Sequence, residues 1–481
     1  MTVSLQHLLL DPALPALMMS DMTLDSRQVS AGDLFVALPG QHHDGRDFID
    51  AALAKGAVAV LTEKIPDSLL QNPRVISVEG LSLRLGELAD RFYRSPSASL
   101  KLMAVTGTNG KTSIVELVGQ ILRSMGHTAG AIGTLGMRVV ASQDETRNTT
   151  PDCISLHRQL AQWRDNAVGW VAMEASSHAL DQGRLSGLAI DAAVFTNLSR
   201  DHLDYHTSME AYCAAKLRLF HDFDPKVRIF NADDALLLPH REAWGETGLG
   251  ISLKGAPAEI QVSVIGVAPL VIELETPWGV RQIKSSLAGR FNAFNLSVAV
   301  TLLAAMGLPF DAVTAAAEEV RPVVGRLQRV DFESDITVFV DYAHTPDALE
   351  RALSALSEFG VGGLIWVVFG CGGDRDRGKR AQMGAVAAEI ADRLVVTSDN
   401  PRSESPEAII DDILTGCRHV DPLIQVDRAA AIALAVSQAS TGDVVLIAGK
   451  GHETYQEVGG IRQSFCDADH ALKNLSLRRA A

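Results

Sequence analysis

The sequence predicts an α/β protein of three domains: a small N-terminal α/β domain, a central domain on a mostly parallel sheet, and a C-terminal Rossmann-like α/β domain. Three observations lead to this prediction. The chain has 481 residues, which suits a few domains of about 100–200 residues each. Apolar runs alternate with helical patterns along most of the chain. Two short segments rich in polar, small or proline residues divide it.

The N-terminal domain is expected to span residues 1–97. Short apolar runs at 33–38 and 57–61 predict strands, and short helical patterns lie between them. The segment from Arg94 to Ser99 is small, polar and contains a proline, so we expect a linker there.

The central domain is expected to span residues 98–326, and the C-terminal domain residues 327–481. An apolar run at 100–107 precedes a helical pattern at 112–126, and the alternation continues to a second boundary near 321–326. The C-terminal part repeats the alternation, and its apolar runs end in small or polar residues. Open α/β sheets bind ligands beyond the carboxyl ends of their strands, so both parts are expected to present site loops.

The overall charge excludes some classes of partner. Acidic residues outnumber basic ones by 58 to 43, and the net charge of −15 disfavours nucleic acid and anionic membranes. No apolar run approaches the roughly 20 residues that cross a bilayer, and no basic region precedes the short apolar run at the N-terminus. We expect a cytoplasmic protein with small-molecule substrates, no nucleic-acid partner and no membrane span, and we take it to be a monomer.

The cysteines predict neither a metal site nor a disulfide framework. They are five in number, scattered, and without C-x-x-C spacing: Cys153, Cys213, Cys371, Cys417 and Cys466. We expect reduced thiols that are buried as small hydrophobic side chains.

A glycine-rich loop is the strongest local signal. The segment Gly107-Thr108-Asn109-Gly110-Lys111-Thr112 lies between a predicted strand and an amphipathic helix. Backbone amides at a helix N-terminus cradle phosphate, Lys111 would add charge at the β- and γ-phosphates, and the Thr112 hydroxyl would bind magnesium. The strict pattern has glycine where this chain has Val105, so the loop is shorter. The flanking elements disfavour a chance turn, and the motif indicates a P-loop, ATPase-like central domain that binds a nucleoside triphosphate.

This loop, with NLSRDHLDYH at 197–206 and GKGHE at 449–453, resembles the Mur ligase family, the ATP-dependent amide ligases of peptidoglycan assembly. The resemblance extends over nearly the whole chain. It implies the three domains predicted above, and two linkers would let the third domain close over the nucleotide.

The resemblance implies a magnesium site. From the residues alone, Glu174 could be a solvated loop acid, His202 a structural histidine and Lys216 a solvated helix lysine. The family uses the matching residues, with a carbamate made from carbon dioxide on the lysine, as magnesium ligands. It therefore implies Mg²⁺ held by Thr112, Glu174, His202 and carbamylated Lys216, with Lys111 completing the catalytic set. Two metal ions would neutralise charge between ATP and a carboxylate substrate.

Four residues are implied on the ATP side of the site. Asn295, in GRFNAFN at 289–295, matches the family's adenine contact, with a helix N-cap as the alternative. Arg326 matches an interdomain arginine, although the family usually has proline where this chain has Val324. The resemblance also implies that Asp341 binds the ribose and that His344 lies near the phosphates.

The resemblance also implies a uridine-nucleotide site. Ser26, in the turn signal at 25–27, matches a nucleotide contact of the family's first domain. The residues implied to hold the rest of the UDP-muramoyl dipeptide are Thr149, Thr150, Ser176, Gln182 and Arg184. From the residues alone, hydroxyls and an arginine suit diphosphate and carboxylate oxygens.

The tetrad Asp399-Asn400-Pro401-Arg402 follows a predicted strand and resembles that of diaminopimelate-adding family members. A guanidinium can clamp the distal carboxylate that distinguishes meso-diaminopimelate from lysine. A turn that begins the next helix is the alternative, and both can hold. Arg375, Gly449 and Glu453 match further amino-acid contacts, although the basic run 375–380 could also be a solvated loop.

The implied reaction has two steps. The γ-phosphoryl group of ATP passes to the carboxylate of UDP-N-acetylmuramoyl-L-alanyl-D-glutamate, and the diaminopimelate amine then attacks the acyl phosphate. The alternatives are a lysine-adding homologue, a folate polyglutamylating ligase, an inactive nucleotide-binding scaffold and a nucleic-acid motor. The folate ligases usually have G-K-[GS] after the loop asparagine and lack the first domain, intact Lys111 and Lys216 disfavour the scaffold, and the acidic charge disfavours the motor.

Overall fold

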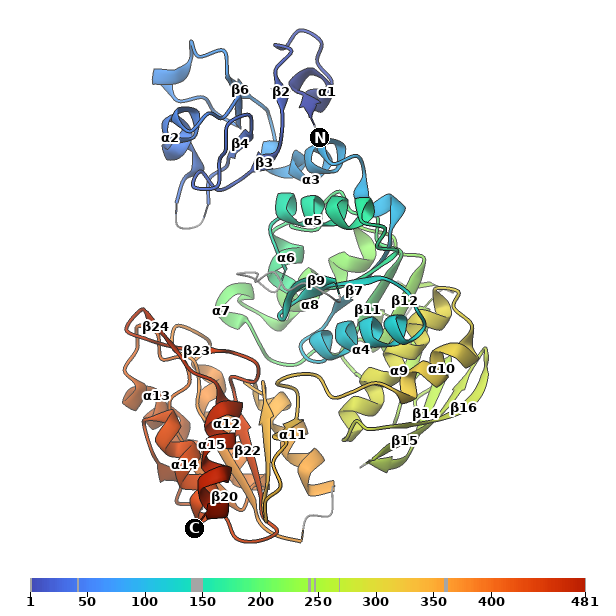
Figure 1. The fold of residues 1–481 in the computed structure, drawn as a ribbon, viewed down its shortest axis with the longest axis vertical. Helices are drawn as coiled ribbons and strands as arrows, with labels where there is room; N and C mark the ends of the chain where they lie inside the picture. The colour runs from blue at the N-terminus through green and yellow to red at the C-terminus, as the bar shows by residue number, and fades with distance from the viewer. Residues whose placement is uncertain are drawn as a thin grey trace. The chain divides into compact units, whose positions relative to one another are not determined.

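The computed structural model describes residues 2–40, 43–139, 150–240, 244–245, 248–267, 269–358 and 362–480. Met1–Ala104, His127–Ala193 and Arg218–Pro225 pack as one compact unit, and Val105–Gly126, Val194–Leu217 and Lys226–Ala481 pack as a second. Helices and strands alternate along the chain (Figure 1), which confirms the predicted α/β class.

A parallel four-stranded sheet forms the centre of the N-terminal region. Its strands are β3 (Met22–Thr23), β4 (Leu34–Ala37), β5 (Ala59–Thr62) and β6 (Val75–Ser77), in that order. Alternate residues of β4 point to opposite faces, as the strand period requires. Leu34 and Val36 pack in the same core as α3 (Leu81–Phe92), and Phe35 and Ala37 in the same core as α2 (Ile49–Ala54). The smaller elements here are β1 (Val3–Ser4), α1 (Leu5–Leu9), β2 (Met18–Met19), η1 (Gly45–Phe48) and η2 (Asp67–Leu69).

The predicted linker is more ordered than expected. Pro96–Ser99 form a 3₁₀ turn, η3, with proline in its first turn, where a missing amide hydrogen costs nothing. Ser97 is buried, and its hydroxyl accepts a hydrogen bond of 2.9 Å from the amide of Ala189. Arg164 donates to the carbonyls of Tyr93 and Arg94 at 2.9 and 3.0 Å. Long-range hydrogen bonds therefore order a segment whose composition indicated a loop.

A ten-stranded sheet contains the strands of the central part of the sequence, in the order β16-β15-β14-β13-β12-β11-β7-β10-β8-β9. The strands are β7 (Lys101–Thr106), β8 (Ala129–Gly133), β9 (Gly136–Val139), β10 (Trp170–Glu174), β11 (Ala192–Phe195), β12 (Val227–Asn231), β13 (Gly248–Ser252), β14 (Ile260–Val267), β15 (Leu270–Thr276) and β16 (Gly279–Ser285). Pairs β8/β10, β12/β13 and β13/β14 are parallel, whereas β8/β9, β14/β15 and β15/β16 are antiparallel. The mostly parallel sheet expected from the apolar runs is thus extended by antiparallel hairpins.

The helices of this part of the sequence are α4 (Lys111–Ser124), α5 (Cys153–Asp165), α6 (Ser177–Asp181), α7 (Leu203–His206), α8 (Met209–His221), η4 (Leu238–His240), α9 (Arg290–Ala305) and α10 (Phe310–Glu318). Helix α9 is buried along nearly its whole length, from Asn292 to Ala304. Its small and apolar side chains allow neighbours on every face.

The C-terminal region is a six-stranded sheet covered by helices on both faces. The order is β17-β18-β22-β19-β20-β21, and every pair except β17/β18 is parallel. The strands are β17 (Gln328–Arg329), β18 (Thr337–Asp341), β19 (Ile365–Phe369), β20 (Arg393–Val396), β21 (Leu423–Ile424) and β22 (Val444–Ala448), with a separate hairpin of β23 (Tyr455–Val458) and β24 (Ile461–Ser464). Helices α11 (Pro346–Glu358), α12 (Gly378–Ile390) and α13 (Pro406–Leu414) share one core with the sheet, and α14 (Arg428–Gln438) and α15 (Asp467–Ala480) share the other.

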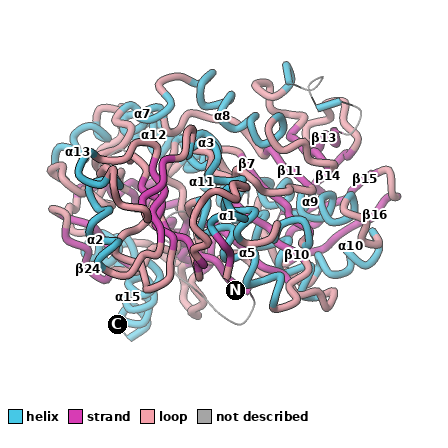
Figure 2. Tube along the Cα trace, turned by 90° about the horizontal axis from the view of Figure 1, so that it is seen from above, coloured by secondary structure: helices cyan, strands magenta, loops and turns pink. Residues whose placement is uncertain are grey.

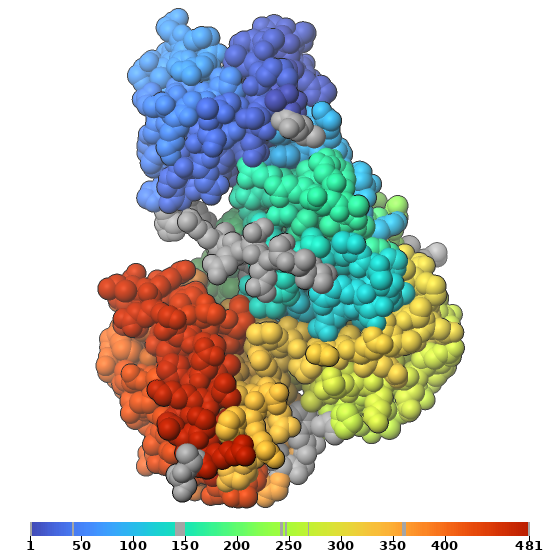
Figure 3. All heavy atoms as spheres, viewed as in Figure 1, coloured from blue at the N-terminus to red at the C-terminus, as the bar shows by residue number. Residues whose placement is uncertain are grey.

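The layering of this region is visible in the drawings. The ribbon and the tube both show helices beside its strands (Figures 1 and 2), and Figure 3 draws all heavy atoms of the described residues in the view of Figure 1. Parallel strands with both faces covered present their carboxyl ends as the accessible edge for ligands, as the Rossmann-like prediction requires.

Two further expectations can be compared with the structure. Within the described residues, no helix is long and apolar enough to cross a membrane. All five cysteines are free, and four are buried as predicted. Cys466 is only half-buried, so the expectation of burial is wrong for that residue.

Candidate functional site

The predicted phosphate loop occupies the turn between β7 and α4. Gly107 has a φ of +140° and Gly110 a φ of +91°, which side chains rarely adopt. A Cβ on Gly107 would lie 1.9 Å from Oγ1 of Thr196, and one on Gly110 would lie 2.7 Å from Oδ1 of Asn295. The N-cap of α4 is Gly110, which has no side chain that could cap the helix. Backbone amides at the N-terminus of a 14-residue helix are suited to an anion.

The two polar side chains that follow the loop lie against it. Lys111 donates from Nζ to the carbonyl oxygens of Gly107 and Thr108, each at 2.8 Å. Thr112 is buried, and its hydroxyl accepts a hydrogen bond of 2.8 Å from Nη2 of Arg326. Arg326 is therefore placed beside the hydroxyl that the sequence suggested for magnesium.

Asn295 lies inside α9, whose N-cap is Gly289, so the alternative of a helix N-cap at Asn295 is wrong. The side chain is buried, and its Oδ1 is the atom nearest to the position of a Cβ on Gly110. Its Nδ2 donates to Oδ1 of Asn292 at 3.4 Å. The structure thus brings the predicted adenine contact to the phosphate loop.

Asp341 ends β18 and is buried. Its Oδ1 accepts from the amide of Ala343 at 2.7 Å, and its Oδ2 from the amide of Leu327 at 2.5 Å. Burial raises the pKa of Asp341 above its usual value, although the charge of Arg326 and the two amides oppose this shift. The Arg326 guanidinium stacks over the ring of Tyr342 at 4.4 Å. The Asp341 carboxylate therefore links the backbone next to Arg326 to the end of β18.

Asp201 is a site residue that sequence reasoning missed, although it stands beside His202. Its carboxylate is buried and lies 3.4 Å from Nε2 of His202. Burial alone would raise its pKa, but the nearby basic groups, His202 first, and the hydrogen bond from the His202 amide outweigh burial and lower it. Asp201 is thus an anion at neutral pH.

His344 is neutral by contrast. Burial, reinforced by the charge of Lys379, lowers the pKa of His344 to about 4. Nδ1 of His344 donates to the carbonyl oxygen of Tyr342 at 2.7 Å, so Nε2 is the ring atom left to accept a hydrogen bond. His202 has a φ of +54° and a side chain that is 39% exposed, which leaves its ring accessible to a ligand.

Lys216 is buried, with 1% of its surface exposed, so the residue-level alternative of a solvated helix lysine is wrong. Its Nζ donates to the carbonyl oxygen of Gly107 at 2.8 Å and lies 4.4 Å from the centre of the Tyr212 ring. Burial, and then the charge of Lys111, lowers the pKa of Lys216 well below its usual value. The amine is therefore held in an environment that favours its neutral, nucleophilic form.

Glu174 ends β10 and is 1% exposed, so the alternative of a solvated loop acid is wrong. Its Oε1 accepts from the amide of Thr134 at 2.8 Å and its Oε2 from the Thr134 hydroxyl at 3.2 Å. A Cβ on Gly133 would lie 2.3 Å from Oε1, so a larger residue at the adjacent strand end would displace the Glu174 side chain. The carboxylate is held rigidly at the end of its strand.

A cavity of ≈ 1220 Å³ is lined by three of the six residues predicted to bind the uridine nucleotide. Ser26, Gln182 and Arg184 line it. Arg184 donates to Oε1 of Gln182 at 2.6 Å and to the carbonyl oxygen of Thr150 at 2.8 Å. The Thr150 hydroxyl donates to Oγ of Ser176 at 3.4 Å. Thr149, also predicted, lies outside the described residues.

The same cavity contains two cations that sequence reasoning did not identify, Arg158 and Lys55. Lys55 donates to the carbonyl oxygens of Ser26 and Arg27, each at 3.0 Å, and so fixes the turn that presents Ser26. Arg158 pairs with Asp21 at 2.9 Å. Neither residue carries a local motif, because each is placed by partners far away in the sequence.

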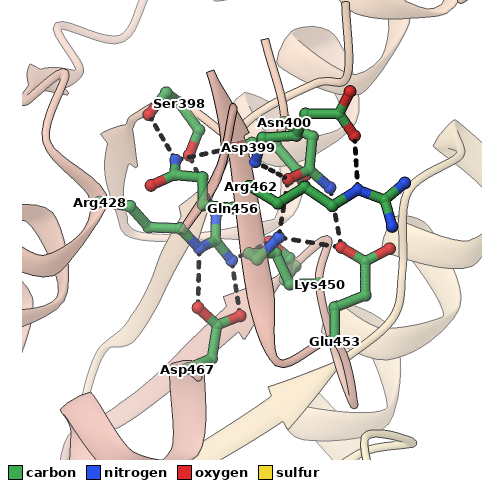
Figure 4. Close-up of polar contacts among 11 residues, drawn as sticks. Ser398, Asp399, Asn400, Arg428, Lys450, Glu453, Gln456, Arg462 and Asp467 are labelled. Atoms are coloured by element: carbon green, nitrogen blue, oxygen red, sulfur yellow. Dashed lines mark hydrogen bonds and ion pairs between the residues drawn. The ribbon is translucent and has the colours of Figure 1, made fainter. Parts of the chain in front are cut away.

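The tetrad Asp399-Asn400-Pro401-Arg402 follows β20, which ends at Val396. Asp399 and Asn400 are drawn with Glu453 and Lys450 in Figure 4. Asn400 is buried and donates from Nδ2 to Oε2 of Glu453 at 2.8 Å. Gly449 has a φ of +119°, and a Cβ there would lie 2.4 Å from Oδ2 of Asp399. The structure thus brings together the predicted residues Asp399, Asn400, Gly449 and Glu453.

Arg402 lies in the same loop with a φ of +52°. It donates from Nη1 to the carbonyl oxygen of Gly373 at 2.7 Å, and its backbone amide donates to Glu457 at 3.0 Å. The following helix, α13, begins after Ser405, whose hydroxyl accepts from the amide of Ala408 at 3.4 Å. The expected helix start is confirmed, and Arg402 lies before it.

The basic run 375–380 is only partly solvated. Arg375 is exposed, whereas Arg380 is 1% exposed and pairs with Glu404 at 2.8 Å and with Asp412 at 2.9 Å. Hydrogen bonds from Arg380 lower the pKa of Glu404 to about 2, against the effect of burial. Glu404, which the sequence did not single out, ties this run to the loop of Arg402.

Comparisons with known proteins agree with this geometry. The chain matches family models described as the Mur ligase family, catalytic domain over residues 19–93, the Mur ligase middle domain over 105–303, and the Mur ligase, glutamate ligase domain over 325–451. The three matched segments contain all the described residues predicted for the site except Glu453.

Individual relatives match over nearly the full length. The UDP-N-acetylmuramoyl-L-alanyl-D-glutamate–2,6-diaminopimelate ligase of Coxiella burnetii is 46% identical over 463 residues, 94% of each chain. That of Pseudomonas aeruginosa is 45% identical over 470 residues, 96% of each chain. A solved structure described as a ligase of the same name is 35% identical, with a TM-score of 0.70 and 100% of both chains covered.

Proposed function

Because this chain belongs to the Mur ligase family, we propose that it joins meso-diaminopimelate to UDP-N-acetylmuramoyl-L-alanyl-D-glutamate, with ATP converted to ADP and phosphate. The arrangement around Asn400 is the observation that carries this proposal. An arginine, a carboxylate and a carboxamide gather on loops at one end of a parallel sheet. They offer a cation for the distal carboxylate of diaminopimelate and an anion for an ammonium group.

ATP is proposed to bind at the N-terminus of α4. The helix amides and Lys111 would hold the β- and γ-phosphates, and Arg326 would approach them from beside Thr112. Asn295 would contact adenine, Asp341 would bind the ribose, and neutral His344 would lie near the phosphates. Helix α9 and strand β18 are rigid supports for these contacts.

The donors proposed for Mg²⁺ suit a hard cation. They are the carboxylate of Glu174, the hydroxyl of Thr112, a carbamate on Lys216 and, as the one nitrogen, His202. The described residues contain no group of three or more His, Cys, Asp and Glu side chains arranged for a metal, so phosphate, carbamate and water oxygens would complete the coordination. When bound, Mg²⁺ supplies positive charge that offsets the repulsion between ATP and a carboxylate substrate.

The surroundings of Lys216 support its proposed carbamylation. A neutral amine can attack carbon dioxide, forming an N–C bond and releasing one proton, whereas an ammonium cannot. Burial and the nearby Lys111 favour the neutral amine by lowering the pKa of Lys216. The product is an anion, and the positive charge of Lys111 would then attract it.

The cavity lined by Ser26 and Arg184 is proposed to receive the uridine nucleotide. Its volume of ≈ 1220 Å³ exceeds that of most drug-sized pockets, which hold about 300–1,000 Å³, and so suits a nucleotide sugar. Arg158, Arg184 and Lys55 would offset the charge of the diphosphate and the peptide carboxylate. We propose residues 1–97, 98–326 and 327–481 as domains for the uridine nucleotide, ATP and the amino acid, in a monomer that acts in the cytoplasm.

The proposed chemistry relies on positioning and charge. Lys111 would stabilise the γ-phosphoryl group as it moves to the substrate carboxylate, and the residues around Asn400 would orient the diaminopimelate amine toward the acyl phosphate. The amine nitrogen forms the amide bond, the acyl C–O bond to phosphate breaks, and the amine loses a proton to solvent or a base.

Product analysis tests this proposal. The purified protein is incubated with ATP, MgCl₂, UDP-N-acetylmuramoyl-L-alanyl-D-glutamate and meso-diaminopimelate, and the products are separated and identified by mass spectrometry. A UDP-muramoyl tripeptide formed in equal amounts with ADP and phosphate would support the proposal. Activity with a folate substrate in place of the uridine nucleotide would support the folate ligase instead, and ATP turnover stimulated by DNA would support the motor.

A further inference from the structure

Lys450 occupies the turn after β22 and is fully buried, although no ligand contact is proposed for it. Its Nζ donates to Oδ1 of Asn400 at 3.1 Å and to Oε2 of Glu453 at 2.9 Å (Figure 4). The ring of Tyr455 lies 5.4 Å from the ammonium. A buried lysine normally requires such partners, because an uncompensated charge in the interior is costly.

These contacts fix which way the Asn400 amide points. Its Oδ1 accepts from Lys450 and from the backbone amide of Glu457, the latter at 2.9 Å. Its Nδ2 donates to Oε2 of Glu453. A flipped amide would place NH₂ against the ammonium and against a second donor, so the observed orientation is strongly preferred. One Nδ2 hydrogen then remains for an acceptor on a ligand.

Lys450 also fixes Glu453. Both described hydrogen bonds of that carboxylate reach Oε2, from Lys450 and from Asn400. Oε1 is therefore left to accept from a ligand ammonium.

The turn that carries Lys450 is anchored on the ATP side of the region. The amide of Gly449 donates to the carbonyl oxygen of Asp341 at 3.0 Å. A Cβ on Gly451 would lie 2.8 Å from the carbonyl oxygen of Gly325. The backbone on either side of Lys450 is thus held by contacts with Asp341 and Gly325, which lie outside the amino-acid site.

We infer that Lys450 is a positioning residue of the amino-acid site, which holds Asn400 and Glu453 in the orientation that receives the incoming amino acid. This inference rests on the proposed function for its kinetic consequence, but not for its structural one. Lys450 would not touch the substrate. It would orient the two side chains that do touch the substrate, Asn400 and Glu453. Loss of Lys450 should therefore weaken binding of the amino acid and leave binding of ATP unchanged.

The first test is kinetic. Lys450→Met is expected to raise the KM for meso-diaminopimelate about 10- to 100-fold, which corresponds to losing hydrogen bonds to charged groups, with little change in the KM for ATP. Arg462→Met is the matched control, because Arg462 is a nearby cation of β24 that is 64% exposed and pairs with Glu457 instead. The control should change either KM less than about threefold. Equal increases in both KM values for Lys450→Met would indicate a general structural role and overturn the inference.

A double-mutant cycle separates positioning from independent effects. If Lys450 acts through Asn400, the Lys450→Met change should cost much less in an Asn400→Ala background than in the wild type. Additive effects would contradict the inference. Should Lys450→Met fail to fold, Lys450→Gln can replace it, because glutamine retains a hydrogen-bond donor on a side chain of similar length. The KM for meso-diaminopimelate of Lys450→Gln is expected to rise above that of the wild type, but less than if the donor were lost completely.

Crystal structures of the wild type and Lys450→Met decide the structural part without turnover. The inference predicts that Asn400 rotates or Glu453 leaves its position in the variant. Unchanged side chains would overturn the inference even if the ligase is active. Displaced side chains in a protein that makes no tripeptide would instead support the positioning role and reject the proposed function.

Discussion

Lys111 and Lys216 both donate to the carbonyl oxygen of Gly107, each from Nζ at 2.8 Å. Two amines that share one acceptor lie close enough for their positive charges to repel each other. Lys216 is the more buried of the two, and burial, followed by the charge of Lys111, lowers the pKa of Lys216 well below its usual value. The phosphate loop thus brings the P-loop lysine and the proposed carbamate lysine to one backbone atom.

Lys216→Met should remove activity. The substitution keeps the length of the side chain but cannot form a carbamate, and loss of such a preorganised charge costs about 100-fold or more in kcat. Phosphate release measures the effect. In the wild type, ¹³C-bicarbonate should give a carbamate signal in the ¹³C spectrum that Lys216→Met lacks. Full activity of the variant would show that no carbamate is needed.

Gly107→Ala should weaken both folding and ATP binding. The φ of +140° and the 1.9 Å approach to Thr196 leave no room for a Cβ, and such backbone strain costs about 1–3 kcal/mol. Denaturant unfolding and ATP titration measure the two effects. Gly119→Ala in α4 is the control, because a Cβ there meets nothing within 4 Å and should be neutral or stabilising by up to about 1 kcal/mol. Similar results for the two variants would contradict the assigned loop geometry.

Arg402→Met should change the choice of amino acid. If the guanidinium clamps the distal carboxylate, kcat/KM for meso-diaminopimelate should fall about 30-fold or more, in line with a loss of 2 kcal/mol or more. L-lysine lacks that carboxylate, so its lower kcat/KM should change little. Arg377→Met removes a neighbouring arginine that is 71% exposed and serves as the control. An equal fall for both amino acids would reject the clamp.

Glu404→Gln should lower the free energy of unfolding at neutral pH and should make that free energy less sensitive to acid. The pKa of Glu404 is about 2 in the folded chain, below the usual value of about 4.3 for an unfolded glutamate. The unfolded state therefore binds more protons between these values, so the stabilisation is present above pH 4.3 and is lost as the pH falls toward 2.

The variant should lose about 1–3 kcal/mol at pH 7, because Arg380 keeps Asp412 but loses a charged partner. Its free energy of unfolding should also fall less steeply than that of the wild type between pH 4.3 and pH 2. Glu389→Gln, at an exposed position of α12, should match the wild type in both respects. Parallel pH profiles for Glu404→Gln and the wild type would show that the ion pair with Arg380 does not cause the loss of stability in acid.

Local patterns in the sequence were sufficient to predict the strands and the phosphate loop. Buried runs such as Ile365–Phe369 are apolar throughout, and Gly107 and Gly110 stand where the backbone needs positive φ. The start of α13 was also readable, because Ser405 and proline form a local signal. These features depend on neighbours within a few residues.

Features that depend on partners far away in the sequence could not be predicted from local residue patterns. Lys216 lies in an ordinary helical pattern, and its burial depends on Gly107, far away in the sequence. Asp201, Glu404 and Lys450 likewise gain their roles through partners on other loops. The family resemblance supplied the prediction for Lys216, and nothing in the sequence supplied one for Lys450.

The account depends most directly on the identity of the amino acid. The measurement is phosphate release by the wild type with ATP, Mg²⁺ and the uridine-nucleotide muramoyl dipeptide, with meso-diaminopimelate and L-lysine added in parallel reactions. The account predicts turnover with diaminopimelate and little or none with lysine. Turnover mainly with lysine would contradict the role of Arg402, and no turnover with either amino acid would contradict the proposed ligase.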